Sequence, residues 1–337
     1  MRIDHQTAIF EIIKRKTEGK DSLGNIVGEI LSISQDAVYR RFRGETQLTI
    51  FELEKLCKHF EISLDSLFEI NKNAVLFNFK QLDEYEFSMA RYLEKILEDL
   101  KLIKAQKNPE LIITVSNIPL LQLMNFPHLV RFKLFFWAKT HLQMKEYEGK
   151  SFAYEKLPED SFAYGHEALR IYNSIPSKEI YDSSFLRGFV DEVYYYYKAE
   201  HFEDPTYAVY MLELLGRFVD HLEAQAIIGK KFISTTEPPA SGNELEMYKN
   251  DTLNGNGATL YRTADHCGLY ITHNLLNFLH TTDKVYIEDS IKVLNKQMAN
   301  SSMISVVNEK ERNSYFSKVR GMINNMKKKI ELELEEE

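Results

Sequence analysis

One short segment concentrates side chains that can make paired hydrogen bonds. Between residues 35 and 43 the chain reads Gln-Asp-Ala-Val-Tyr-Arg-Arg-Phe-Arg. Arginine can form a bidentate contact with guanine, glutamine can do the same with adenine, and tyrosine can reach a phosphate or a thymine methyl. The segment therefore offers the chemistry needed to read the edges of DNA bases, although an ordinary solvent-exposed helix face would use the same residue types.

Helical spacing decides which of these side chains face outward. Ser34 can cap a helix over residues 34–43, and Gly44 supplies a left-handed stop. Val38 and Phe42 are four residues apart and share the side expected to be buried. The side chains turned outward, our candidate base-reading residues, are then Gln35, Asp36, Tyr39 and Arg40. The candidate phosphate contacts are Arg41, Arg43 and Lys20, and the candidate neutral contacts from the following loop are Thr46 and Gln47.

The flanking residues predict a compact bundle of five short helices. Apolar residues recur at helical spacing, and the helices are expected at about 4–19, 22–31, 34–43, 49–60 and 63–68. Gly24 and Gly28 leave room for a closely packed neighbour on the second helix. Thr49 and Glu52 have the spacing of a capping box. Two short helices joined by a three-residue turn can place the second helix in the major groove of DNA.

The same segment resembles the Cro/repressor-type (XRE-like) helix-turn-helix family over about residues 4–70. The residues that carry the resemblance are Gly28, Ile33-Ser34 at the turn, Val38, Gly44 and the tail from Leu53 to Phe68. The chain departs from the family at Ser32, where a turn glycine is common, and at Phe42, where many members carry an acidic residue. The resemblance implies DNA binding through the third helix, usually by a two-fold dimer on a palindromic site.

Length and charge predict two domains with different partners. A chain of 337 residues exceeds the usual size of a single core, so we expect a DNA-binding domain over 1–70 and a larger domain over 71–337. The first holds 10 Lys and Arg against 12 Asp and Glu, but its cations cluster at 14–16 and 40–43. The second has a net charge of −6, so we expect it to sense or assemble without extending the DNA contact.

The larger domain is expected to be mostly helical, so the predicted fold class is mainly α. Its expected helices are about 83–105, 128–147, 159–174, 178–199, 205–229, 287–300 and 309–334. Residues 75–79 are expected to be extended. A small antiparallel β meander is expected at about 244–273, with strands at 245–248, 258–261 and 268–272 and a hairpin turn at 254–257.

No group of residues in this domain has the spacing of a known catalytic or metal site. The polar clusters are Asp265-His266-Cys267 with His273, and the run His201 to Asp204. The glycines of 254–257 lack the lysine and helix of a phosphate-binding loop. We therefore expect no catalytic residue, no metal and no cofactor. The run Tyr194 to Tyr197 is interpreted as core packing or as part of an aromatic ligand pocket, and Trp137 as a core residue.

These observations predict a sequence-specific DNA-binding transcriptional regulator, not an enzyme. Its expected partners are double-stranded DNA, a second copy of the chain and a small-molecule or peptide effector. Two cysteines, the absence of an apolar run behind a basic start and the lack of a long apolar stretch predict a cytoplasmic location without membrane contact. The alternative is a peptide- or ligand-sensing helical receptor with a DNA-binding head, although no clean 34-residue repeat supports it. An enzyme with such a head is a third hypothesis.

Overall fold

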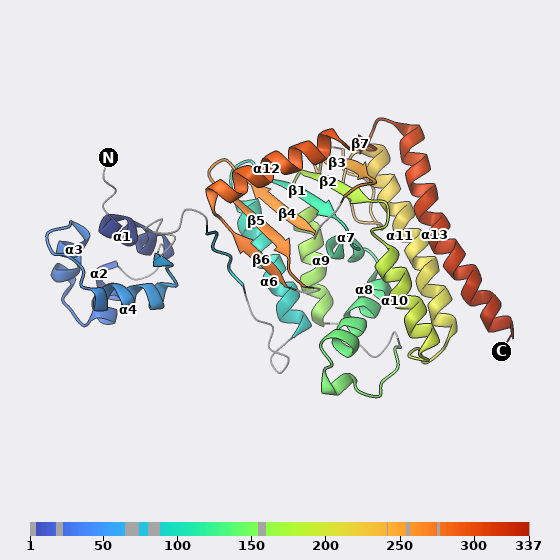
Figure 1. Cartoon of the computed structure of the whole chain (residues 1–337), viewed down its shortest axis with the longest axis horizontal. Coiled ribbons are helices and arrows are strands. Elements are labelled where there is room, and N and C mark those ends of the chain that lie inside the picture. The colour runs from blue at the N-terminus through green and yellow to red at the C-terminus, as the bar shows by residue number, and fades with distance from the viewer. Residues whose placement is uncertain are drawn as a thin grey trace. The chain divides into compact units, whose positions relative to one another are not determined.

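The computed structural model divides the chain into two compact units, residues 1–76 and 77–337 (Figure 1). It describes residues 5–17, 23–64, 74–79, 88–153, 160–240, 242–253, 257–274 and 277–336. The predicted domain boundary at residue 70 lies outside these ranges, and so do residues 254–256 of the turn predicted at 254–257. So do Lys20, the expected cap Ser22 and most of the predicted fifth helix.

The described part of unit 1 is a bundle of four helices around one small core. The helices are α1 (His5–Lys16), α2 (Leu23–Leu31), α3 (Gln35–Phe42) and α4 (Ile50–Phe60). Each contributes apolar residues at helical spacing, which places them on one side of the helix. The buried core comprises Ile9, Phe10, Ile13, Val27, Leu31, Val38, Leu56 and Phe60.

Local capping chemistry sets the ends of α3 and α4. The predicted cap of α3 is confirmed, because the Ser34 hydroxyl accepts a hydrogen bond from the Ala37 amide. The predicted capping box is also confirmed: Thr49 and Glu52 exchange side chain to backbone hydrogen bonds in both directions. A Cβ atom on Gly28 would lie 2.9 Å from the Ile33 carbonyl oxygen, so only glycine lets the turn before α3 pack this closely on α2.

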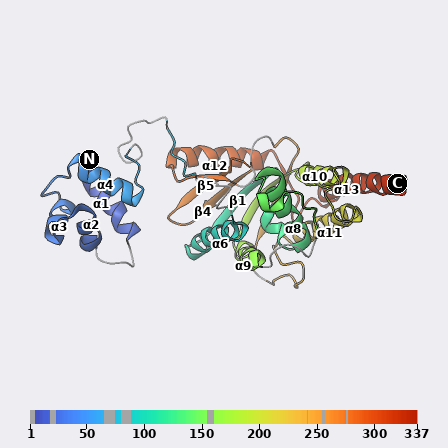
Figure 2. The ribbon, with the colours of Figure 1, turned by 90° about the horizontal axis from the view of Figure 1, so that it is seen from below.

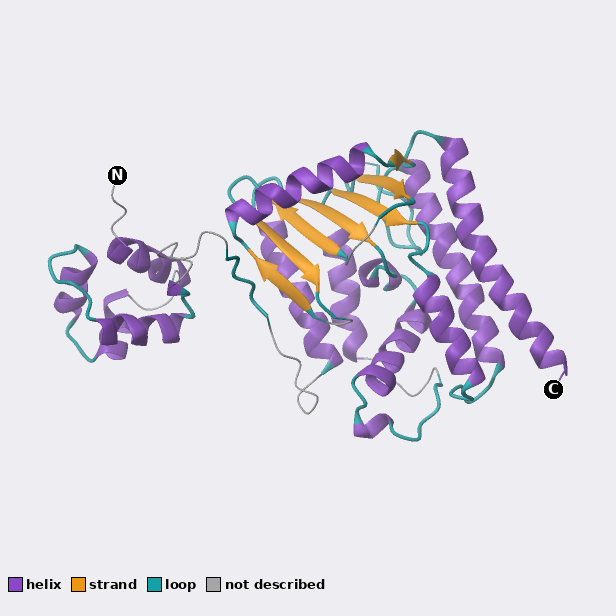
Figure 3. Cartoon of the chain, viewed as in Figure 1, coloured by secondary structure: helices purple, strands orange, loops and turns teal. Residues whose placement is uncertain are grey.

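Unit 2 is built on a seven-stranded mixed sheet (Figure 3). Its strands are β1 (Glu110–Val115), β2 (Ser177–Asp182), β3 (Leu245–Asn250), β4 (Ala258–Arg262), β5 (Cys267–Thr272), β6 (Phe278–Thr281) and β7 (Ser302–Met303). Their order across the sheet is β6-β5-β4-β1-β2-β3-β7. The three strands β1, β2 and β3 run parallel, and the remaining neighbours pair antiparallel.

This sheet shows that the predicted fold class, a mainly helical domain with a small antiparallel meander, is wrong. The three predicted strands exist, but β1 and β2 lie between β3 and β4. The helix predicted over 178–199 is instead the strand β2 followed by α10 (Arg187–Lys198). Strands β1, β6 and β7 were not predicted. Parallel strands covered on both faces lose the alternation of apolar and polar residues that marks a half-exposed strand.

Helices cover both faces of the sheet (Figure 2). On one face α12 (Lys284–Ala299) packs on β1, β4 and β5 through Ile287 and Leu294. The other face is covered by α6 (Met89–Ala105), α7 (Leu120–Leu123), α8 (Pro127–Phe136) and α9 (Asp160–Asn173). Next to them, α10, α11 (Thr206–Ile228) and α13 (Glu309–Glu336) pack side by side.

Most helices predicted for unit 2 are confirmed with small shifts of their ends. The helix predicted over 128–147 is an exception, because α8 ends at Phe136 and continues as the π-helical turn η1 (Trp137–His141) and the 3₁₀ turn η2 (Lys145–Tyr147). The predicted extended segment 75–79 pairs with the sheet at one point, where Asn78 and His280 exchange backbone hydrogen bonds of 2.7 and 3.0 Å. Within the described ranges, no helix is both long and apolar enough to cross a membrane.

Candidate functional site

The exposed side of α3 presents the residues that the sequence selects for base contact. Val38 is fully buried on the opposite side. Gln35, Asp36, Tyr39 and Arg40 are all exposed. An α-helix such as α3 is about 10–12 Å across with its side chains, which is close to the width of the DNA major groove. The helix therefore presents a polar, hydrogen-bonding strip that a groove could accommodate.

Arg40 and Arg43 share an acidic neighbour in the loop after α3. The Arg43 Nε lies 2.6 Å from a Glu45 carboxylate oxygen, and the Arg40 Nε lies 3.8 Å from the other. The hydrogen bond from Arg43 lowers the pKa of Glu45. Because Glu45 is about half exposed, this ion pair is weak. Arg43 can therefore exchange Glu45 for an anion that it binds more strongly, such as phosphate.

If α3 contacts DNA, replacing Glu45 by glutamine is expected to strengthen the binding. The substitution removes a negative charge that competes with phosphate for Arg43, so the plot of log affinity against log salt should steepen by about one unit. Fluorescence anisotropy on one duplex at several salt concentrations measures both effects. Glu54→Gln removes the same charge from an exposed pair with Lys58 on α4 and serves as the control. Equal changes in the two variants would show that Glu45 has no specific role.

Arg41 does not lie on the exposed strip of α3. Its guanidinium donates a hydrogen bond of 2.7 Å to Glu52 and another of 3.1 Å to the Ala37 carbonyl, and its side chain is only 14% exposed. Since Glu52 also closes the capping box of α4, Arg41 links α3 to the start of the next helix. Of the loop residues, Gln47 is exposed and the Thr46 carbonyl accepts a hydrogen bond from Gln6.

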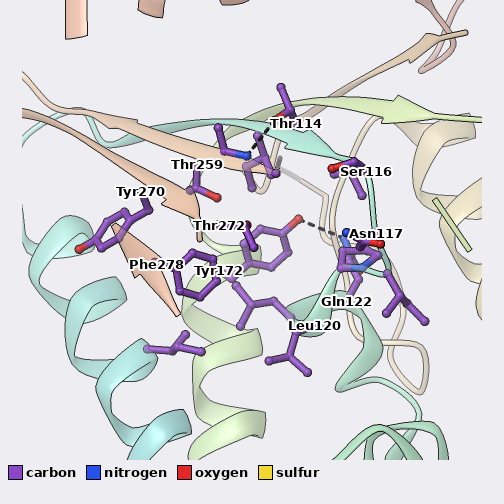
Figure 4. Close-up of a pocket in the computed structure, with 18 of the residues that line it drawn as sticks. Thr114, Ser116, Asn117, Leu120, Gln122, Tyr172, Thr259, Tyr270, Thr272 and Phe278 are labelled. Carbon is purple, nitrogen blue, oxygen red and sulfur yellow. Dashed lines mark hydrogen bonds between the residues drawn. The ribbon is translucent and has the colours of Figure 1, made fainter. Parts of the chain in front are cut away.

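Unit 2 contains a cavity of about 490 Å³ at the carboxyl end of β1 (Figure 4). It lies between the sheet and the helices α6, α7 and α10. The strands, the loop after β1 and α7 contribute lining residues that include Thr114, Asn117, Leu120, Thr259, Tyr270 and Phe278. Ile113 also lines it and is only partly buried, although β1 has hydrogen-bonded neighbours on both sides. A central strand with an accessible side chain indicates that the cavity reaches the middle of the sheet.

A buried carboxylate lies at the floor of this cavity. Glu179 of β2 is 1% exposed and has no ion-pair partner among the described residues. Three hydroxyl groups donate to it: that of Tyr172, that of Ser177 at 2.8 Å and that of Tyr181 at 2.9 Å. Burial, and then the nearby Glu179 charge, raise the pKa of Tyr172 well above its ordinary value. The hydroxyls therefore stay protonated and stabilise the carboxylate.

The wall formed by α8 and α10 holds a buried ion pair. The Lys133 ammonium donates hydrogen bonds of 2.6 Å to both oxygens of Glu192, and the two side chains are 8% and 14% exposed. Burial lowers the pKa of Lys133 and raises that of Glu192, whereas their mutual attraction opposes both shifts. The ammonium also lies 5.3 Å from the centre of the Trp137 ring. The pair neutralises itself and leaves no free charge.

Two polar atoms of cavity-lining residues have no hydrogen-bond partner within the part of the chain that is described. They are the Trp137 Nε1 and the Ser116 Oγ. Trp137 is 5% exposed, as expected for a core residue, yet it also lines the cavity. The tyrosine run lies elsewhere: Tyr196 and Tyr197 are buried, Tyr195 is 53% exposed, and none of the four lines this cavity.

The polar clusters of the sequence bring together no metal ligands. Across the described ranges, no three His, Cys, Asp or Glu side chains form a group that could hold a metal ion. Cys267 begins β5, and its thiol is not part of a disulfide. Comparison of the chain with models of protein families, with curated proteins and with solved structures finds no match.

A chain of amide groups connects the cavity to a buried histidine. Gln122 donates a hydrogen bond of 3.3 Å to the Tyr172 hydroxyl, as Figure 4 shows, and one of 2.9 Å to Gln225. The Gln225 amide nitrogen lies 2.7 Å from His221 Nε2. Burial lowers the pKa of His221 to about 4. His221 is therefore neutral in the folded protein over most of the pH range in which an unfolded chain would protonate it.

Unit 2 is expected to lose stability as the pH falls from about 6.5 to 4. Because burial depresses the pKa of His221 in the folded protein, the unfolded chain binds a proton at this residue at a higher pH than the folded protein does. The stability that the neutral His221 contributes is therefore fully present above pH 6.5. The free energy of unfolding then decreases in acid, by about 3 kcal/mol in total. Urea unfolding at pH 7.5 and pH 4.5 measures the difference. His221→Phe should reduce this pH dependence, whereas His166→Phe, at an exposed position, should not. An unchanged pH dependence in His221→Phe would contradict the assignment.

Proposed function

We propose that the chain is a sequence-specific DNA-binding transcriptional regulator that uses α3 as its recognition helix. The observation that carries the proposal is the division of α3 into two sides. Val38 anchors one side in the core, while Gln35, Tyr39 and Arg40 lie exposed together on the other. These three residue types can bond adenine, thymine or phosphate, and guanine respectively.

The other polar residues of α3 and its C-terminal end have separate roles in this proposal. Arg43 is exposed at the end of α3 and exchanges Glu45 for a phosphate. Arg41 acts as a positioning residue, since its bond to Glu52 holds α3 against α4. Asp36 is exposed in the first turn and can accept a hydrogen bond from cytosine. The C-terminal unit, with its net negative charge, contributes no DNA contact in this proposal.

The proposed binding form is a homodimer on a palindromic site. A single eight-residue helix contacts only a few base pairs, and two copies related by two-fold symmetry double the number of bases read. Selection of bound duplexes from a random DNA library tests both statements. We expect one enriched palindrome whose half-sites lie about one helical turn apart. Absence of any enriched sequence at both low and moderate salt would contradict the proposal.

A further inference from the structure

We propose that the cavity at the carboxyl end of β1 binds an uncharged, ring-containing small molecule that accepts a hydrogen bond from Trp137. This inference concerns unit 2 alone. It goes beyond DNA binding and holds whether or not α3 binds DNA. Four observations indicate the kind of ligand. They are the position of the cavity in the sheet, the apolar character of its walls, the polar atoms of lining residues that have no partner, and the charges around it.

The cavity lies where the order of the strands reverses. From β1 the chain builds the sheet in one direction through β2 and β3, and then returns to place β4 on the other side of β1. The Ala258 amide of β4 donates a hydrogen bond of 2.8 Å to Thr114 at the end of β1. In open, mostly parallel sheets, ligands bind outside the carboxyl ends of the strands where the strand order reverses, and in this mixed sheet the reversal lies between β1 and the antiparallel β4. The volume of about 490 Å³ falls within the range of small-molecule sites.

The walls are mainly apolar and come from both the sheet and the helices. Apolar side chains from two helices and two strands line the cavity, among them Ile96 and Leu100 of α6, Leu121 of α7, Ile113 of β1 and Phe278 of β6. Phe278 is 38% exposed, which is unusual for an aromatic residue in a sheet covered by helices. Such walls favour a ligand with a hydrophobic ring system, since burying that surface would remove both partners from water.

Two of the residues that line the cavity each carry a buried polar atom without a hydrogen-bond partner among the described residues. An indole N–H can only donate, and the Trp137 Nε1 is buried without a partner in the described structure. The Ser116 hydroxyl is also unpaired there. Buried donors without partners are rare in native proteins because they lose their hydrogen bonds to water and form no others in exchange. A carbonyl or ether oxygen on the ligand would satisfy the Trp137 N–H.

The charges around the cavity exclude an anion and do not call for a cation. The charged lining residues are Asp99, Glu179, Glu192 and Lys133. Lys133 is already paired with Glu192, and Glu179 already accepts three hydroxyl hydrogen bonds. Asp99 accepts a hydrogen bond of 2.7 Å from Lys95. An anionic ligand would therefore meet an excess of carboxylates, whereas a cation would find their hydrogen-bonding capacity mostly used.

Fluorescence of the full-length protein tests this proposal without knowledge of the natural ligand. The probe is prodan, an uncharged naphthalene with one ketone, and its comparison is 1-anilinonaphthalene-8-sulfonate, which is similar in size but anionic. Trp137 is the single tryptophan of the chain, so its emission reports on the cavity directly. We expect saturable quenching of Trp137 with energy transfer to prodan, and an affinity for the sulfonate at least about tenfold lower.

Variants then locate the bound probe. Ile113→Phe fills the cavity and should weaken prodan binding by about tenfold or more, and Leu120→Phe provides a second, partly buried position if Ile113→Phe does not fold. Ile227→Phe makes the same change at a side chain that is 52% exposed on α11 and should bind as the wild type does. Trp137→Phe removes only the donor and the indole, and should weaken binding about three- to tenfold when followed by prodan emission.

Three results would overturn the proposal. The first is the absence of saturable prodan binding to the wild type. The second is equal prodan affinity in the wild type and in a folded cavity-filling variant, which would place the probe elsewhere on the protein. The third is binding of the sulfonate as tightly as prodan, which would contradict the argument from charge.

Discussion

Val38→Asp is expected to unfold unit 1 while leaving unit 2 folded. Val38 is fully buried in the core of unit 1, and an aspartate there would place a carboxylate among apolar side chains with no partner. Burial of an unpaired charge costs several kcal/mol. A unit of this size has a total stability of only about 5 kcal/mol or somewhat more, so the loss should exceed what it can tolerate.

Limited proteolysis with mass spectrometry measures this result on the full chain. New cleavage sites should appear in residues 23–64, whereas residues 88–336 should stay as resistant as in the wild type, and DNA binding should be lost on every sequence. Val38→Ile keeps the site apolar and serves as the control. Resistance of Val38→Asp to cleavage within α2, α3 and α4 would show that Val38 is not the anchor of α3.

Lys133→Met is expected to destabilise unit 2 by about 3–5 kcal/mol, the usual effect of removing one partner of a buried ion pair. The substitution leaves the Glu192 carboxylate buried without the ammonium that donates hydrogen bonds to it and neutralises its charge. Because burial already raises the pKa of Glu192, the loss of Lys133 should raise it further, and the destabilisation should be larger at pH 8 than at pH 5.

Urea unfolding of the single and double variants measures the size and origin of this effect. Lys133→Met combined with Glu192→Leu should recover most of the lost stability, since an apolar pair of similar volume carries no desolvation penalty. A double variant as unstable as Lys133→Met alone would assign the loss to packing against Trp137 and Phe189 instead of to charge.

The features of unit 1 could be predicted because the chemistry behind them is local. The hydrogen bond from the Ala37 amide to Ser34 and the exchange between Thr49 and Glu52 each join residues three positions apart. The burial of Val38 follows from the helical period alone. The sequence did not indicate the pairing of Arg41 with Glu52, which are 11 positions apart on different helices. Glu52 was predicted only as a capping residue, and its remaining oxygen gave no local signal.

The sheet of unit 2 could not be predicted because its pairing is distant. β1 lies between β2 and β4, whose residues follow it by more than sixty and more than a hundred positions. Lys178 and Glu179 at the start of β2 carry charges that are unusual in a strand, and both lie within the helix predicted over 178–199. The burial of Glu179 is explained by the hydroxyl groups of Tyr172, Ser177 and Tyr181, which donate hydrogen bonds to its carboxylate.

The cavity could not be predicted either, because its lining residues are distant from one another in the sequence. Ile96, Trp137 and Tyr270 come from three different elements, Ser116 comes from the loop after β1, and the four share no motif. Trp137 was correctly predicted to be buried, but burial does not indicate that its N–H lacks a partner. That property depends on what the fold fails to place next to it, which no local spacing encodes.

The exposed side of α3 is tested most directly by Arg40→Ala on the duplex selected by the wild-type protein. Arg40 lies on the same exposed side as Asp36 and Tyr39. If it reads a base, the variant should lose about 1–3 kcal/mol of binding free energy on the selected duplex, with relaxed preference at one position and little change on a scrambled duplex. Binding to both duplexes at two salt concentrations measures this difference. Unchanged binding to the selected duplex, or an equal loss on both duplexes, would contradict base reading by Arg40.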